Sequence, residues 1–487
     1  MILIIVANSA GLVNQAALAS RLRLHGEEVV VLCDGWRETL TPAYASLLRA
    51  TDCDLVYLSD LVADTAVMND TWCLPFQSEA GAGRVEVDAA RSLTEEAPRV
   101  IAEPRTMSSF LSDDTLRRFR SLRHVFGRQS IAVNEFCKLR KPAFAILGDD
   151  GIAVNPRITS ILKRNSIPLL CVPYGYGGVE DLENELTIKQ TDGRYITTAE
   201  EGGAEVAEHY PHWVKSGTHA GALLLPPEVI LASESIGVTI RHPWRTYGSE
   251  ADLLCVSGQQ YARHLVLEGV SDDRIIVTGS LSGLQIHEIL QTDSNARKAF
   301  RQPAKIGRGQ TRVLVCWPPS YHATHGNRTD FPSNYAALTQ ATLYPLLDRP
   351  DVDLTVALHP STLPEDRAVF TDLKIPLSTS YIMDLIPKHD IFLAASSSTV
   401  RWAIACGKPV LNYDFYKFCS TVFRNLPGVI HVETHQAYIA TMQKLLADET
   451  FFATTAGAQI SVADDWGLVD DRFLEELLAV SRRETSV

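Results

Sequence analysis

The stretch MILIIVANSAGLVNQAALASRLRLHGEEVVVLCDG, residues 1–35, is the clearest evidence of the fold class. Its first seven residues form a continuous apolar run with the length of a strand that is buried on both faces. A turn of small residues (NSAG, 8–11) and a helical pattern over 14–25 follow, and EEVVVLCDG (27–35) supplies a second strand that ends in a turn dipeptide. Strand, helix and strand in this order predict a βαβ unit and therefore a parallel sheet.

The same alternation continues for about 280 residues. Helical patterns over 155–164 and 257–268 lie among further strand candidates. Two stretches, 76–115 and 180–220, do not fit the alternation of strands and helices in either series, and we expect them to be inserted surface helices or loops at the mouth of a cleft. The strand candidates are DLVYLS (54–59), AFAILG (143–148), PLLCVPYG (168–175), DLLCVSG (252–258) and IIVTGS (275–280). We therefore expect a doubly wound α/β domain.

A second series of strands begins after a polar, locally basic stretch at 291–312, which is typical of a linker. Its strand candidates are VLVCWPPS (313–320), LTVALHP (354–360), IFLAASSS (391–398), PVLNYD (409–414) and GVIHVE (428–433). The chain should form two Rossmann-like lobes facing a central cleft, one over 1–295 and one over 310–470. The helical pattern at 471–487 is expected to cross back to the first lobe.

Composition narrows the class of protein. The 487 residues are 46% hydrophobic and 21% charged, the ordinary globular mixture, and their net charge of -13 argues against a general nucleic-acid binder. No apolar run approaches the roughly 20 residues that span a bilayer, and no basic segment precedes the first apolar run. Nine scattered cysteines are typical of reduced thiols in a cytoplasmic protein. Peripheral membrane contact and the oligomeric state stay open.

The motif Gly148-Asp149-Asp150-Gly151 follows a predicted strand directly. Ligands of open parallel sheets bind beyond the carboxyl ends of the strands, so one of these two carboxylates could accept a proton there. The glycines would let the backbone turn and a substrate approach. The structural alternative is that Asp150 or Asn155 caps the next helix while Asp149 is solvated.

Two further motifs follow strands of the second series. His359, with Pro360 after it, could direct its ring at a phosphate oxygen of a leaving nucleotide, or could simply bond a neighbouring carbonyl. Ser396, Ser397, Ser398 and Thr399 precede a helical pattern, where hydroxyls and the N–H groups of a helix start can bind an anion. The alternative for these four residues is an ordinary helix cap.

Loops after the first strand of each series supply the remaining candidates, which are Gly11, Pro319 and Ser320. His322 and His325 have a spacing that a metal could use, but a loop around the phosphates or base of a nucleotide fits equally well, and we expect neither metal nor cofactor. No Walker A motif, GxGxxG or Gly-x-Ser-x-Gly elbow is present, which weighs against ATP-dependent enzymes, dehydrogenases and that type of hydrolase.

The order of these motifs resembles a known signature. Asp149-Asp150-Gly151, then His359-Pro360, then Ser396 to Thr399 is similar to the set found in bacterial sialyltransferases and their polysialyltransferase relatives, which are GT-B fold glycosyltransferases. The resemblance implies an inverting, metal-independent transfer of a sugar from a nucleotide donor to a glycan or other hydroxyl acceptor. It implies an acidic base for the acceptor, a histidine and serines at the donor phosphate, and a CMP-linked acidic sugar.

Two more distant resemblances define the alternatives. Residues 391–414 are similar to a stretch of CDP-glycerol-type phosphotransferases, in which a His-Gly pair stands where this chain has Tyr174-Gly175. LGDD, RIIVTGS and ALHPS resemble pieces of UDP-N-acetylglucosamine 2-epimerases. The acidic His-x-Glu-Ala-Gly stretch of those epimerases is replaced here by VPYGYGG (172–178), and SSSTVRWA (396–403) replaces their phosphate loop.

Overall fold

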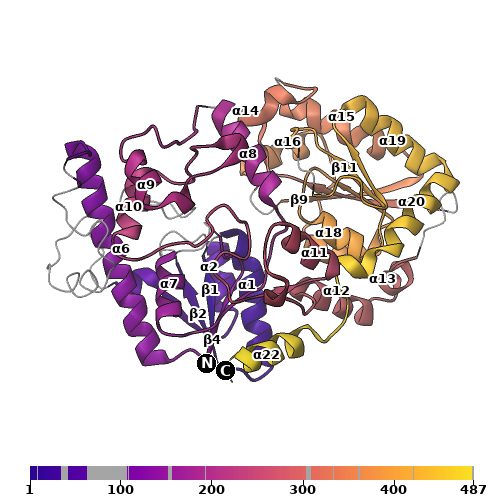
Figure 1. Cartoon of the computed structure of the whole chain (residues 1–487). Coiled ribbons are helices and arrows are strands. Elements are labelled where there is room, and N and C mark those ends of the chain that lie inside the picture. Colours follow the sequence, from indigo (N-terminus) through magenta and orange to yellow (C-terminus); the bar gives the residue numbers. More distant parts are fainter. Residues whose placement is uncertain are drawn as a thin grey trace. The chain divides into compact units, whose positions relative to one another are not determined.

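The computed structural model describes residues 1–7, 9–34, 42–62, 107, 109–151, 156–191, 193–302, 309–332, 334–359, 362–419 and 422–484 (Figure 1). The residues fall into two compact units, within each of which most of the spatial contacts are made. The first contains Met1–Cys255, Leu265–Ile276 and Leu474–Val487, and the second contains Val256–His264 and Val277–Phe473. Each unit is built on its own sheet.

The sheet of the first unit has the strand order β3-β2-β1-β4-β5-β6-β7. Ile2 of β1 lies opposite Val29 of β2 on one side and Phe144 of β4 on the other, both in parallel register, and Figure 1 shows these three strands side by side. The strands are β1 Ile2–Val6, β2 Val29–Cys33, β3 Asp54–Tyr57, β4 Phe144–Leu147, β5 Leu169–Cys171, β6 Leu253–Val256 and β7 Ile275–Val277. Every residue of β1, β2 and β4 is buried, as apolar runs without alternation predict.

Helices connect these strands, as parallel crossovers require. They are α1 Ser9–Leu24, α2 Pro42–Arg49, α3 Leu58–Leu61, α6 Asp113–Arg140, α7 Pro156–Arg164, α8 Val179–Thr191, α9 Gly203–His209, α10 Pro227–Glu234 and α11 Gln259–Leu267. The longest is α6, which the Ser112 side chain caps by accepting from the Thr115 N–H and which ends at Lys141, a residue in the left-handed conformation. Its buried residues share a hydrophobic core with α10.

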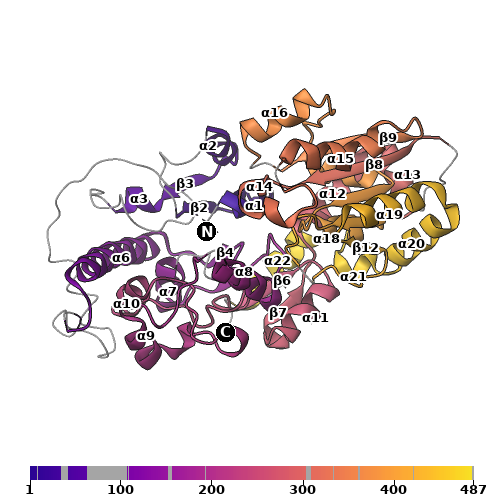
Figure 2. The ribbon, with the colours of Figure 1, turned by 90° about the horizontal axis from the view of Figure 1, so that it is seen from above.

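The second unit holds a five-stranded sheet in the order β12-β11-β10-β8-β9. Its strands are β8 Thr311–Trp317, β9 Val352–Leu358, β10 Ile391–Ala394, β11 Val410–Tyr413 and β12 Val429–Val432. The helices are α12 Leu281–Thr292, α13 Ser294–Ala299, α14 His322–His325, α15 Tyr335–Leu347, α16 Pro364–Asp372, α17 Ile382–Leu385, α18 Val400–Ala405, α19 His435–Ala447, α20 Glu449–Ser461 and α21 Ala463–Trp466. Figure 2 shows α15 beside β8 and β9. The last helix, α22 Phe473–Glu484, lies almost wholly in the first unit.

The structure confirms the predicted strands and their parallel arrangement, with small shifts at the ends. DLVYLS gives a strand only to Tyr57, since α3 begins at Leu58, and LTVALHP extends two residues earlier, to Val352. The eight cysteines described are free thiols, six of them buried. None of the helices within the described residues combines the length and the apolarity needed to cross a bilayer.

Candidate functional site

Asp149 lies one residue beyond Gly148, at the carboxyl end of β4. Its side chain is half-buried. One carboxylate oxygen accepts a hydrogen bond from the Gly151 N–H at 3.1 Å, and the other lies 3.5 Å from the Tyr174 hydroxyl, the long limit of a hydrogen bond. The carboxylate therefore retains acceptor capacity at a partly open position.

Burial, together with the negative charge of the neighbouring Asp150, raises the pKa of Asp149 to about 7, against the opposing effect of the hydrogen bond from the Gly151 N–H. A carboxyl group with a pKa near 7 exists in both protonation states at physiological pH. That is the property of a side chain that accepts a proton in one step and releases it in the next.

Asp150 has a different environment, because its side chain is completely buried. Its two carboxylate oxygens accept hydrogen bonds from three backbone N–H groups, those of Gly248 at 2.9 Å, Glu250 at 3.1 Å and Ala251 at 2.9 Å. Burial raises the pKa of Asp150, while these N–H groups and Arg274 oppose the rise. With its acceptors occupied by the backbone, Asp150 is an anchor of the 248–251 loop and has no reach to a substrate. The expected helix cap is not its role either, and Asn155 lies outside the described residues.

Arg274 fixes the same loop from another side. Its guanidinium donates to the carbonyl oxygens of Gly248 and Asp252, at 3.3 and 3.4 Å, and to that of Ala251. Within the loop, buried Glu250 pairs with Lys163 at 2.9 Å. Gly151 packs against the segment just before this loop, since a Cβ at that position would lie 2.8 Å from the Arg245 carbonyl oxygen. The loop beside the acid motif is thus rigidly held.

Two glycines let an aromatic ring approach the acid motif. A Cβ on Gly11 would lie 3.0 Å from the Tyr174 ring, and one on Gly148 would also lie 3.0 Å from that ring and 2.8 Å from the side-chain nitrogen of buried Gln15. Sequence reasoning placed Gly11 among the substrate-binding candidates, but missed Gln15 and assigned no role to Tyr174 beside the carboxylate. Both follow strands of the sheet, on α1 and after β5, so the rule that function gathers at strand ends was the available signal.

In the second unit, Ser396 follows β10 in the left-handed conformation, with φ of 49°. Its N–H donates to the side-chain oxygen of Asn412 on β11 at 2.8 Å, which explains how a non-glycine residue is held there. Its hydroxyl oxygen is buried and makes no hydrogen bond within the described part of the chain. Asn412, which sequence reasoning did not single out, therefore shapes the turn.

The other three hydroxyls differ in availability. Ser397 and Thr399 hydrogen-bond each other at 2.8 Å, and Thr399 also contacts the Cys316 sulfur at 3.4 Å, whereas Ser398 is exposed. At the start of the helix, the N–H groups of Val400 and Arg401 donate to the carbonyls of Ser397 and Ser398 at 3.1 and 3.4 Å, so they are already hydrogen-bonded within the turn. The exposed hydroxyl of Ser398 is the group best placed to meet an anion.

His359 follows β9 immediately, as predicted, and is exposed at the end of the strand. Its N–H donates to the Trp317 carbonyl at 3.0 Å, which ties it to the neighbouring β8. Partial burial of the ring lowers the pKa of His359 below its usual 6.5, which favours the neutral ring with a single N–H. Pro360, predicted to lie beside it, falls outside the described residues.

The loop after β8 holds the remaining candidates. Pro319 and Ser320 are half-buried, and the Ser320 hydroxyl accepts from the His322 N–H at 3.4 Å. In the part of the chain that the structure describes, no group of three or more His, Cys, Asp or Glu side chains could hold a metal ion. The His325 ring instead contacts the Thr324 hydroxyl through Nδ1, at 2.7 Å.

Comparisons with known proteins extend this picture at the level of the fold. No protein-family model and no curated protein matches the chain. Among solved structures, the calicheamicin glycosyltransferase CalG4 matches with a TM-score of 0.50 at 13% identity, over 99% of this chain and 98% of that chain. The UDP-GlcNAc 2-epimerase from Neisseria meningitidis, bound to UDP-GlcNAc, gives a TM-score of 0.48, 14% identity and coverage of 98% and 99%. The wall teichoic acid polymerase TagF matches with a TM-score of 0.46 at 7% identity, over 100% of this chain and 88% of that chain.

Identities this low establish the fold and nothing finer, and the TM-score of CalG4 is the highest of the three. The chain is therefore a GT-B fold protein with two parallel-sheet α/β domains. The resemblance to bacterial sialyltransferases is carried by the short motifs of the sequence. Fold alone does not determine activity, so the activity has to be argued from the residues of the site.

Proposed function

We propose that the chain is an inverting, metal-independent glycosyltransferase that moves a sugar from a nucleotide donor to a hydroxyl acceptor. The observation that carries the proposal is Asp149, a half-buried carboxylate at a strand end whose pKa lies at about 7. The carboxylate oxygens of its neighbour Asp150 accept hydrogen bonds from backbone N–H groups, which leaves Asp149 as the base. The GT-B fold supports glycosyl transfer as the activity, because it is the fold of the glycosyltransferase CalG4.

In this mechanism Asp149 accepts the proton of the acceptor hydroxyl while the hydroxyl oxygen attacks the anomeric carbon of the donor sugar. The bond between that carbon and the phosphate oxygen breaks, and the nucleotide leaves with the electron pair. Attack opposite the leaving group inverts the anomeric configuration. We assign His359 and Ser398 of the second unit to the phosphate, where one ring N–H and one hydroxyl can donate to the charge that develops.

The motif order favours a CMP-linked acidic sugar as the donor and a glycan as the acceptor, by resemblance to bacterial sialyltransferases. Incubation of the protein with CMP-, UDP- and GDP-sugars, with and without acceptor glycans, tests this choice. We expect loss of a CMP-linked donor that depends on an acceptor. Turnover of a UDP- or GDP-sugar alone would correct the donor, and release of nucleotide from none of them would contradict glycosyl transfer.

An epimerase is the second candidate function. The Tyr174 hydroxyl and the Asp149 carboxylate lie 3.5 Å apart, and two adjacent proton-handling groups suit the removal and return of a sugar C2 proton. Exchange of that proton with deuterated solvent in the absence of any acceptor would identify an epimerase. A CDP-glycerol-type phosphotransferase is less well supported, because Tyr174 stands where the resemblance requires a histidine.

Nucleotide affinity should depend on the second unit. We expect His359→Ala to weaken binding of the product nucleotide about tenfold or more, since a hydrogen bond to a charged group contributes about 1.5–3 kcal/mol. The triple variant S396A/S397A/S398A should weaken it at least as much, through the lost Ser398 donor and the disturbed turn. Isothermal titration with CMP measures both effects.

His287→Ala is the matched control, because His287 lies on α12 of the same unit. It should bind CMP as the wild type does. An affinity of His359→Ala equal to that of the control would remove His359 from the phosphate site.

A further inference from the structure

The turn that begins at Ser396 is connected to the next two strands through side chains. Asn412 of β11 and His431 of β12 are register partners in a parallel pair, so their side chains lie on the same face of the sheet. Asn412 is buried, and its Nδ2 lies 3.2 Å from Nδ1 of the His431 ring. The other ring nitrogen, Nε2, lies 3.2 Å from Oε1 of Glu433, a carboxylate that also pairs with Arg424. A row of polar groups therefore runs from Glu433 to the Ser396 N–H.

The chemistry of the groups determines the direction of each hydrogen bond in this row. The backbone N–H of Ser396 can only donate, so the Asn412 atom that faces it at 2.8 Å must be the carbonyl oxygen. The amide nitrogen of Asn412 then faces His431, and because an amide N–H also only donates, Nδ1 of the ring must be unprotonated. The proton of the neutral ring is left on Nε2, which donates to Glu433. The three bonds all point toward the carboxylate, and hydrogen bonds aligned in this way strengthen one another.

The conformation of the turn depends on this alignment. If His431 carried a proton on Nδ1, that proton would face the N–H groups of Asn412, and the amide could relieve the contact only by turning over. Its nitrogen would then face the Ser396 N–H, so that a donor would meet a donor. Ser396 is in the left-handed conformation, with φ of 49°, which is uncommon for residues other than glycine. The turn therefore depends on its bond to Asn412, and that bond depends on His431.

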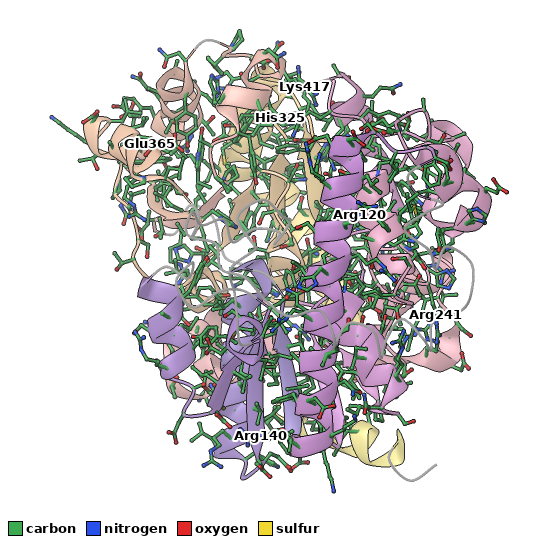
Figure 3. The ribbon with its side chains drawn as sticks, turned by 90° about the vertical axis from the view of Figure 1, so that its left-hand side faces the viewer. Arg120, Arg140, Arg241, His325, Glu365 and Lys417 are labelled. Atoms are coloured by element: carbon green, nitrogen blue, oxygen red, sulfur yellow. The ribbon has the colours of Figure 1, made fainter. Side chains whose placement is uncertain are left out.

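The turn lies at the carboxyl edge of the second sheet, where the flanking loops meet. β10 lies between β8 and β11 in the strand order, and the loops after β8 and β11 contact each other through the rings of His325 and Phe418, whose centroids are 5.2 Å apart. Figure 3 shows these loops together, with His325 and Lys417 labelled. Ser398, whose side chain is exposed, belongs to the turn at the end of β10. A ligand that binds the Ser398 hydroxyl therefore meets a turn whose backbone is set by Asn412.

We propose that His431 is a positioning residue of the donor site, which orients the Asn412 amide and so keeps the 396–398 turn in the form that presents Ser398 to the donor phosphate. This inference rests on the proposed function, which supplies the ligand of the turn. Within the described residues, the ring nitrogens of His431 bond only Asn412 and Glu433, so the ring acts on the turn through Asn412. Its effect belongs to donor affinity, whereas proton transfer at Asp149 takes place in the first unit.

Replacement of His431 tests the proposal through donor binding. His431→Phe keeps the ring without its nitrogen atoms, and His431→Gln keeps a polar group only near the position of Nε2. Both should weaken CMP binding about fivefold and raise KM for the donor by a similar factor, with kcat little changed, because one hydrogen bond is lost. His431→Asn places an oxygen near the position of Nδ1, where it can accept from Asn412, and should restore most of the affinity. His287→Phe on α12 is the matched control and should bind CMP as the wild type does.

Two further measurements show whether His431 acts through Asn412. In an Asn412→Ala background, His431→Phe should cause no additional loss of affinity, because the two residues act as one unit. The ring itself is observed without any ligand by nitrogen NMR of the full-length protein carrying isotope-labelled histidine, at pH 8. The signals absent from His431→Phe assign this ring, and we expect it to be neutral with its proton on Nε2.

The outcomes separate this inference from the proposed function. A proton on Nδ1 of His431, or an additional loss of affinity in the Asn412→Ala background, would overturn the inference. Equal CMP binding by the wild type and His431→Phe would overturn it while leaving glycosyl transfer intact. A wild type that binds none of CMP, UDP and GDP would contradict the proposed function, and with it the role of His431.

Discussion

Replacement of Asp149 by Asn should lower kcat of glycosyl transfer by about 10²-fold or more, because the acceptor hydroxyl loses the group that takes its proton. The amide has nearly the same shape as the carboxylate and can still accept from the Gly151 N–H, so the loop should keep its conformation. Affinity for CMP should stay unchanged, because the proposed phosphate contacts belong to the second unit. Steady-state kinetics together with titration calorimetry measure the two quantities.

The pH dependence of the rate gives a sharper form of this prediction. The base acts in its ionised form, so kcat should rise about tenfold per pH unit below the pKa of about 7 and become constant above it. The Asn variant should lose this dependence. Turnover at the wild-type rate, or a variant that keeps the same rise with pH, would show that the base lies elsewhere.

Stability provides the control for correct folding of this variant. The pKa of Asp149 is raised in the folded protein, so the folded state binds its proton more tightly than the unfolded state. The stabilisation that results is complete below pH about 4 and is lost as the pH rises through about 7. At pH 8 the Asn variant carries no buried charge at this position. It should therefore melt at the same temperature as the wild type or above it.

Replacement of Asp150 by Ala should instead destabilise the first unit, by about 3 kcal/mol or more. Its side chain is fully buried, and its loss leaves the N–H groups of Gly248, Glu250 and Ala251 without their acceptor. Each buried donor left unpaired costs about 1–3 kcal/mol. Urea denaturation at neutral pH, followed by a probe of the first unit, measures the change in the free energy of unfolding.

Asp273→Ala is the matched control, since it removes an exposed carboxylate beside Arg274. It should change the free energy of unfolding by less than about 0.5 kcal/mol. An Asp150→Ala protein as stable as this control, but inactive, would give Asp150 a direct part in the chemistry. The two adjacent aspartates thus have opposite expected signatures, one in rate and the other in stability.

The different roles of Asp149 and Asp150 could not be predicted from the sequence alone. Position after a buried strand identified the pair, because strand ends of parallel sheets meet at one edge. The choice between the two depends on the 248–251 loop, which is about 100 residues away in sequence and donates its N–H groups to Asp150 alone. The 396–399 turn presents the same difficulty, because Asn412 accepts from the Ser396 N–H and Cys316 from the Thr399 hydroxyl, and both residues come from other strands.

Apolar runs and helical periods are local properties of the chain, so the sequence was sufficient to predict the twelve strands of the described residues, their parallel arrangement and the two-sheet architecture. Which polar groups keep acceptor or donor capacity for a ligand depends instead on the three-dimensional structure. It separated Asp149 from Asp150, placed the Tyr174 ring against Gly11 and Gly148, and enclosed the Ser396 hydroxyl while exposing that of Ser398. The physical reason is that burial and hydrogen bonding depend on neighbours brought together from distant parts of the chain, and these set both the pKa of a group and its reach.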